Sequence, residues 1–253
     1  AAGAITTTGS NASGGIAGKG GEVLVYAHAG AVQLGAAITA SGGATAAGGD
    51  TAGAGGVVTV RAGNGNITLN NITTSGGSIG AGGTGAAGGQ ISLMTETTTN
   101  TIGQGTSTLI ATGSTAGTND GSLKVDSFGA VTLDQANNVG TLAAVVRDNA
   151  AAFTYNDTSK LTLDRITTDG VLTGANVGNV PSGAANALTT NGGAVKLTTG
   201  DTLTVSKAIL TTPSGANTIG GSVLLDATTG GITTGAAGAI TTTGSNASGG
   251  IAG

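Results

Sequence analysis

The sequence contains no cysteine and no tryptophan, and it has only 2 proline, 2 phenylalanine, 2 tyrosine and 1 methionine among 253 residues. Without cysteine the chain forms no disulfide, offers no thiolate and builds no cysteine-based metal site. Large side chains dominate the energetics of ordinary cores, and here they are nearly missing. The composition therefore argues against a conventional globular enzyme, and we expect no enzymatic activity and no catalytic residues.

Charge is also scarce. Charged residues make up 8% of the chain, where roughly 25% is usual. Eight Lys and Arg are outnumbered by twelve Asp and Glu and form no basic cluster, which disfavours nucleic-acid binding. No apolar run approaches the ~18 residues that a membrane-spanning helix needs. A net charge of −4 is too small for a chain kept disordered by charge.

The most informative feature is an exact internal repetition. Residues 1–18 read AAGAITTTGSNASGGIAG, and residues 236–253 read the same, an offset of 235 residues. We interpret residues 1–253 as a single continuous segment, slightly more than one unit of a tandem array with a 235-residue period. The alternative is a chain designed with overlapping ends.

A shorter period runs inside the long one. An apolar pair at positions i and i+2 recurs every 28 to 42 residues, in seven copies: Val23/Val25, Val58/Val60, Ile91/Leu93, Leu123/Val125, Phe153/Tyr155, Val195/Leu197 and Val223/Leu225. This alternation is typical of a strand with one buried face. The residues inside the pairs should then face outward: Leu24, Thr59, Ser92, Lys124, Thr154, Lys196 and Leu224. Five of the seven are polar, whereas Leu24 and Leu224 mark a covered or sticky stretch.

Two further apolar motifs follow each pair in most units, for example Val32/Leu34 and then ITASG at 38–42. The fourth unit diverges, with GTLAAVVRD at 140–148. No helical spacing persists, and glycine and β-branched residues oppose helices. The pattern predicts an all-β, right-handed parallel β-helix with about seven three-stranded coils per 235 residues. Seven coils would rise about 34 Å.

Glycine, with 51 residues, concentrates in the connections after the third motif. These connections include residues 42–56, 76–89 and 113–121, and the longest runs from about 170 to 193. All but the divergent fourth unit place the insertion at the same corner, so Gly-rich insertions should line one edge. They form either a flexible fringe or an ordered Gly/Ala layer packed against the coils or a neighbouring fibre.

The rhythm GGVVTVRAGNGNITLNNITTSG at 55–76, and ANNVGTLAAVV at 136–146 followed by FTYNDTSKLTLDRI at 153–166, resemble the filamentous-haemagglutinin-like adhesins of bacteria. The resemblance covers essentially the whole chain. It implies secretion by the two-partner route, a long rod at the cell surface, and roles in adhesion or biofilm. It carries over no binding residue.

Candidate chemistry is sparse. His28 is the single histidine and is expected to face outward. Asp126, Asp134, Asp164 and Asp226 each follow a predicted strand, where aspartate commonly forms turns. A stacked column of these carboxylates could instead bind Ca²⁺. Asp164–Arg165 is expected to be a local surface feature. The threonine-rich motifs resemble ice-binding faces, although threonine also simply suits an outward strand position.

We therefore expect a structural repeat of a long, secreted bacterial surface fibre that mediates adhesion, cell–cell contact or matrix formation. The expected partners are adjacent repeats joined end to end, neighbouring fibres, and host, cell or glycan surfaces. Two alternatives remain open: a carbohydrate-binding or carbohydrate-active β-helix, and a self-assembling sheath or bundle subunit. Isolated fragments should associate end to end, because open sheet edges invite pairing.

Overall fold

A computed structural model describes residues 3–46, 48–114, 119–166, 186–214 and 218–245. Within these ranges the chain is all-β, with strands, turns and no helix. The strands form two eleven-stranded sheets, and every strand pair is parallel. Parallel strands cannot be joined by a tight hairpin, so the chain must cross between sheets after each stretch.

We call the sheet that contains β2 sheet I. Its strands are β2 (Glu22–Ala27), β5 (Val57–Ala62), β8 (Gln90–Thr95), β11 (Ser122–Ser127), β13 (Thr141–Asn149), β15 (Leu161–Leu163), β16 (Leu188–Asn191), β18 (Leu203–Val205), β19 (Ile209–Leu210), β21 (Ile232–Thr234) and β22 (Ile240–Thr241).

Sheet II contains the other eleven strands. They are β1 (Ile5–Thr6), β3 (Val32–Gln33), β4 (Ile38–Thr39), β6 (Ile67–Thr68), β7 (Ile72–Thr73), β9 (Ile102–Gly103), β10 (Leu109–Ala111), β12 (Val131–Val139), β14 (Phe153–Asp157), β17 (Val195–Thr199) and β20 (Val223–Ala227).

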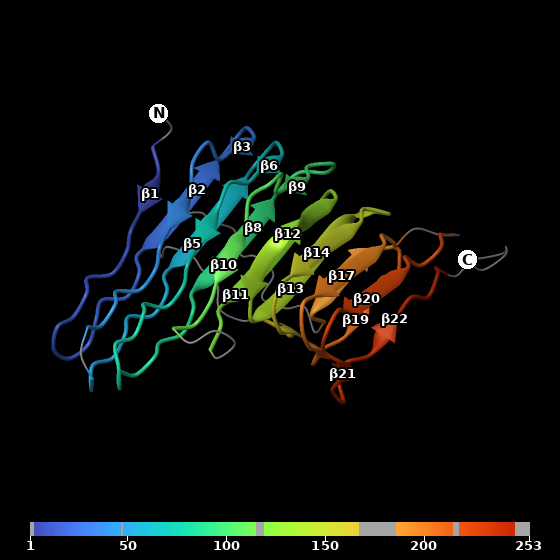
Figure 1. The fold of residues 1–253 in the computed structure, drawn as a ribbon. Coiled ribbons are helices and arrows are strands. Elements are labelled where there is room, and N and C mark those ends of the chain that lie inside the picture. Colours follow the sequence, from blue (N-terminus) through green and yellow to red (C-terminus); the bar gives the residue numbers. More distant parts are fainter. Residues whose placement is uncertain (1–2, 47, 115–118, 167–185, 215–217, 246–253) are drawn as a thin grey trace.

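The chain alternates between the two sheets, and Figure 1 shows its colours advancing in order from the N-terminal to the C-terminal end of the stack. We call each stretch along one sheet a pass. The sheets are strongly curled, which is compatible with the predicted β-helix and also with a parallel half-barrel. The all-β, parallel part of the fold prediction is therefore confirmed.

The core is a continuous set of ladders of medium-sized apolar side chains. The predicted inward pairs are buried in the interior of the stack; Val58 and Val60 are completely buried, as are Phe153 and Tyr155. Ile67 and Ile72, from the second and third motifs of one unit, are also buried. One apolar layer therefore runs through the stack between the sheets, which is how a chain with so few large residues still excludes water.

Part of the outward-face prediction is wrong. Thr154 is half-buried and Lys196 is exposed, but Thr59, Ser92 and Lys124 on sheet I are all buried. Long side chains of neighbouring strands contact one another on this same face. Arg61 stacks over the ring of Tyr26 at 4.7 Å and forms an ion pair with Glu96. The strand period correctly separates the two faces of a strand, but it cannot show that the outer face is covered.

The predicted equivalence of the seven pairs also fails at one point. Phe153 does not continue the ladder of Leu123; it pairs with Val131 in sheet II, while Leu123 pairs with Leu142 of β13. The divergent segment 140–148 is the added strand that displaces the pattern. The pairs before residue 130 lie in sheet I, and those after residue 150 lie in sheet II.

The switch occurs at β12 and β13, the two nine-residue strands. On one side β12 pairs with two short strands, β9 and β10, and on the other with the single strand β14. Strand β13 pairs with the single strand β11 on one side and with β15 and β16 on the other. Each long strand thus joins a divided ladder to a continuous one.

The Gly-rich insertions are an ordered layer wherever the structure describes them. Gly42 N donates to Ser75 O at 2.9 Å, just before the next insertion, and Gly53 N donates to Gly43 O at 2.9 Å within its own. A Cβ on Gly42 would overlap the carbonyl oxygen of Gly53. Glycine is therefore required by the close approach of backbones, and the flexible-fringe interpretation fails for residues 42–46 and 48–56.

The prediction of one insertion edge is also wrong. Insertions 42–56 and 76–89 lead from sheet II to sheet I, whereas the insertion between β19 and β20 leads from sheet I to sheet II. The reason is again the extra strand β13, which shifts every later motif to the other sheet. Most of the predicted insertion at 170–193 lies outside the described residues, and residues 188–191 of it form β16.

Candidate assembly interface

The four aspartates considered for Ca²⁺ do not stack on one another. Asp126 pairs in register with Met94 and Val145, and Asp226 pairs with Thr198. Asp134 is exposed on β12, and Asp164 lies just beyond β15. In the part of the chain that the structure describes, no three His, Cys, Asp or Glu side chains gather at one place. These carboxylates therefore form no common ligand set.

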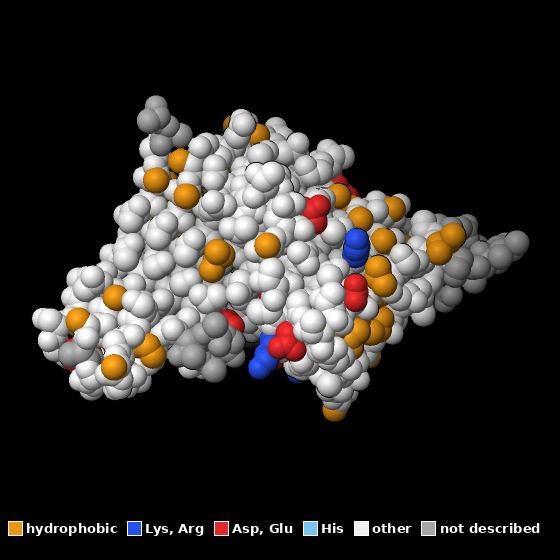
Figure 2. All heavy atoms as spheres, viewed as in Figure 1, with side chains coloured by type: hydrophobic (Ala, Val, Ile, Leu, Met, Phe, Trp, Pro, Cys, Tyr) orange, Lys and Arg blue, Asp and Glu red, His pale blue; other side chains and the backbone are white. Residues whose placement is uncertain are grey.

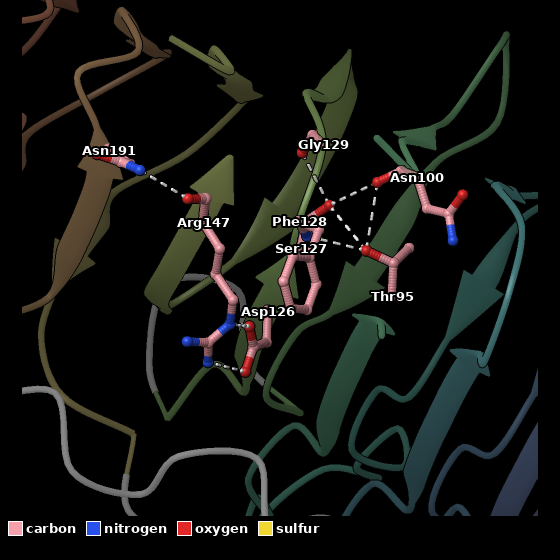
Figure 3. A network of polar contacts seen from close by, with 8 residues as sticks. All are labelled: Thr95, Asn100, Asp126, Ser127, Phe128, Gly129, Arg147 and Asn191. Atoms are coloured by element: carbon pink, nitrogen blue, oxygen red, sulfur yellow. Dashed lines mark hydrogen bonds and ion pairs between the residues drawn. The ribbon is translucent and has the colours of Figure 1, made fainter. Parts of the chain in front are cut away.

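Asp126 is held instead by one guanidinium, drawn in Figure 3. Arg147 Nε donates to Asp126 Oδ1, and Arg147 Nη2 donates to Asp126 Oδ2, both at 2.7 Å. The hydrogen bond to Asp126 raises the pKa of Arg147, although partial burial opposes this. The pair is bidentate and joins adjacent passes β11 and β13 of sheet I, so it fixes packing at the switch.

Figure 3 also shows Asn191 of β16, whose Nδ2 donates to Arg147 O at 3.0 Å. The other labelled residues lie at the corner that follows β8 and β11. Ser127 Oγ donates to Gly129 O at 2.9 Å, and Phe128 N donates to Thr95 Oγ1 at 3.0 Å. The two hydroxyls lie 3.2 Å apart. These hydroxyls and backbone groups hydrogen-bond to one another, whereas the buried Nδ2 of Asn100 has no hydrogen-bond partner among the described residues. We interpret the cluster as a structural corner.

His28 is exposed, as expected from its position, and it contacts one side chain closely. Tyr26 Oη lies 2.9 Å from His28 Nδ1, and the two rings meet edge to face with centroids 5.6 Å apart. Arg165 is exposed and its backbone N–H bonds the carboxylate of Asp164 at 2.6 Å. Both features are local arrangements on the surface, as the sequence predicted for Asp164–Arg165.

One open hollow lies beside the starts of β13 and β15. Its volume is ≈ 240 Å³, and it is lined by Asn119, Asp120, Gly140, Thr141, Lys160 and Thr162. The Asp120 carboxylate already accepts a hydrogen bond from Gly113 N at 2.7 Å, as a turn-forming aspartate does. The hollow therefore holds one acid and one base, not the cluster that the carbohydrate-active alternative requires.

The two ends of the stack are different from its interior. Strands β1, β2 and β3 end the sheets on one side, and β20, β21 and β22 end them on the other. Inward-facing Ile5, Ile232 and Ile240 are 40%, 45% and 44% exposed. Their partners one pass inward, Ile38, Leu203 and Ile209, are 0–1% exposed.

Leu224 adds outward apolar surface at the C-terminal end, where it is 54% exposed. On the face seen in Figure 2, hydrophobic side chains gather toward the C-terminal strands, while charged side chains are few and scattered. An apolar end surface bounded by unpaired parallel strand edges is suited to receive further strands. We therefore take the two end surfaces as the candidate functional site.

Comparison with family models, with curated proteins and with solved structures finds no match to this chain. Among the described residues no helix has the length and apolar character to span a membrane.

Proposed function

We propose that this chain is a structural repeat of a long, secreted bacterial surface fibre, built as a right-handed parallel β-helix of the filamentous-haemagglutinin-like type. Such a fibre would sit outside the cell and mediate adhesion, cell–cell contact or matrix formation. The single observation that carries the proposal is the continuous series of parallel, in-register strand pairs that runs through both sheets. Each pass covers the core positions of the pass beside it, so the stack is suited to grow by adding more of the same structure.

Three properties support the solenoid form. All strand pairs are parallel, the chain alternates between two sheets, and the core is built from small and medium side chains. In a solenoid each coil contacts only its neighbours, so length can grow by adding units. The mechanism is then mechanical and multivalent: coil number sets reach, and repeated weak surfaces give avidity.

Chains with one, two and three copies of the 235-residue unit test this proposal. Small-angle X-ray scattering should give a rod whose length grows by about 36 Å with each copy, because stacked strands lie about 4.8 Å apart. Cryo-electron microscopy of longer assemblies should show a layer line at that strand spacing. Separate compact particles joined like beads would contradict the fibre.

The adhesive role needs its own test. Three copies displayed on a bacterium that does not aggregate should increase attachment to cells or glycan-coated surfaces in proportion to copy number. The control displays a rod of equal length built from an unrelated repeat protein. Equal attachment by both would leave the fibre as a spacer and refute adhesion by this sequence. Binding of one defined glycan, lost in Lys160→Ala at the hollow, would instead favour the carbohydrate-binding alternative.

A further inference from the structure

The same sequence occupies opposite sheets at the two ends of the stack. Ile5–Thr6 and Ile240–Thr241 are the same residues of the repeated segment, 235 positions apart. The first pair forms β1 in sheet II, and the second forms β22 in sheet I. The same residues therefore form a strand at both ends of the stack, but the two strands belong to different sheets.

The pairing of β1 shows what belongs on the free edge of β22. Strand β1 pairs with β4, with Ile5 opposite Ile38 and Thr6 opposite Thr39. If residues 236–253 open a second copy of the unit, the second copy's Ile38 lies opposite Ile240. That Ile38 then lies in sheet I, whereas Ile38 of the first copy lies in sheet II.

We propose that β2, β3 and β4 of a second copy of this unit cover the C-terminal end surface, with β22 in the place of that copy's β1, and that the second copy is turned by half a turn, so that successive copies exchange their two sheets. The proposal rests on the proposed fibre function and adds the geometry of its junctions.

The number of passes supports the same conclusion. From β2 to β22 the described strands make fifteen passes, eight on sheet I and seven on sheet II. An odd number places the next pass on sheet II, where the second copy's β2 pairs with β20. One unit therefore takes seven and a half coils and rises about 36 Å, and the full pattern returns after two units, about 72 Å.

The corners show that the same local motif works at both edges. After β4, Gly56 N returns and donates to Ala40 O at 2.6 Å, and this insertion leads from sheet II to sheet I. After β19, Gly221 N donates to Thr211 O at 3.1 Å, and this insertion leads from sheet I to sheet II. The same kind of Gly-rich corner therefore serves a crossing from sheet I to sheet II as well as one from sheet II to sheet I.

The junction would also bring together the two outward leucines, Leu24 and Leu224. Matching the inward pair Val23/Val25 with Val223/Leu225 places the second copy's Leu24 beside Leu224. Leu224 is 54% exposed at the free end. A leucine neighbour would cover part of that surface, which explains why both exceptions to the polar outward face lie on strands that meet at the junction.

Paired spin labels test the half turn. The chain is residues 1–253 followed by residues 19–253 of a second copy, and it contains no native cysteine to interfere. Lys196 faces outward on β17 of sheet II, and Thr204 faces outward on β18 in the adjacent pass of sheet I. One variant carries Lys196→Cys in both copies; another carries Thr204→Cys in the first and Lys196→Cys in the second. Distances are measured by double electron–electron resonance.

A half turn places the labels of the second variant on one face, seven coils or about 34 Å apart, so its distance should be the shorter. The first variant then spans opposite faces and should give the longer distance. A single copy carrying both substitutions measures the thickness of the stack as a control. The reverse order, with narrow distributions, would overturn the half turn and leave the fibre intact. Broad distributions in both variants would overturn the half turn and the fibre together.

Discussion

The two halves of this stack place their undivided strands in opposite sheets. In the first half, sheet I holds the six-residue strands β2, β5, β8 and β11, and each pass along sheet II is divided into two shorter strands. In the second half, sheet II holds the undivided strands β14, β17 and β20, and the passes of sheet I are divided. The comparison teaches that strand length belongs to the local sequence, whereas the choice of sheet depends on how many passes came before.

Phe153 lies on β14, where the undivided strands of sheet II begin. Its truncation should have the largest effect on stability. It is completely buried and pairs with Val131 on one side and Val195 on the other. Phe153→Ala removes a large side chain from a core with few others, so we expect about 3–5 kcal/mol less stability to unfolding. Urea titration measures it. Thr132→Ala, on the exposed face of β12, is the control and should change stability by less than about 0.5 kcal/mol.

If both halves unfold in one transition, Phe153→Ala should shift the whole urea unfolding curve to lower urea concentration. Two separated transitions, only one of them shifted, would show that the halves are independent and that the shared core does not couple them.

Gly53 tests how tightly the glycine layer packs in the first half of the stack. Its amide hydrogen-bonds to Gly43, and an added Cβ would overlap the carbonyl oxygen of Gly18, which is backbone and cannot turn away. Gly53→Val should therefore cost about 3 kcal/mol, near the upper end for overpacking. The matched control is Gly103→Val on β9, where nothing lies within 4 Å of an added Cβ.

Thermal unfolding followed by circular dichroism compares the two valine variants. Equal stability of both would show that the glycine layer yields easily. It would then be the flexible fringe that the sequence alone also allowed.

Asn137 lies where the divided ladder meets the continuous one. Its side chain is buried, accepts a hydrogen bond from Leu109 N at 2.9 Å, and donates to Leu133 O and Asn156 O at 3.0 Å. Asn137→Ala leaves the amide at the start of β10 without its partner, so we expect a loss of about 2 kcal/mol. The neighbouring Asn138→Ala removes a half-buried side chain and should cost less.

Hydrogen exchange at Leu109 gives the sharper measurement for Asn137→Ala. Its amide should exchange faster than the amide of Ile72, the residue that pairs with Leu109 on β7. Unchanged protection at Leu109 would contradict a role for Asn137 at the switch.

The smallest expected effect is one of pH, at Asp157 in the second half. Burial raises the pKa of this carboxyl, and hydrogen bonds from Tyr155, Val139 and Ser159 only partly oppose it. The folded state therefore holds this proton more tightly than the unfolded state. This group's contribution to stability is lowest above the folded pKa, rises as pH falls through that pKa, and levels off below the unfolded pKa.

Asp157→Asn carries no such proton, so the wild type should gain stability relative to this variant as the pH is lowered from 7 to 3. Urea midpoints across this range measure the difference. Asp134→Asn, at an exposed position of β12, is the control. A wild type that loses stability relative to Asp157→Asn on acidification would mean that the hydrogen bonds outweigh burial.

Much of the local structure could be predicted from the sequence. The pair Val58/Val60, the second motif at Ile67 and the third at Ile72 all lie in strands with those residues buried. The burial of Lys124 could not be predicted, because period-2 alternation reports which face a residue occupies and not what covers it. Open sheet edges at the two ends were expected from the sequence, whereas the exposure of Ile5 and Ile240 depends on their place in the stack.

The sequence by itself determined the strands, the small-residue core and the glycine corners, because each follows from a few neighbouring residues: alternation, β-branched side chains, and backbone contacts that leave no room for a Cβ. Only the tertiary structure decided which sheet each strand joins. A parallel ladder offers the same hydrogen bonds in either sheet, so the identical residues Ile5–Thr6 and Ile240–Thr241 fit both. The one additional strand at 141–149 reverses every assignment after it.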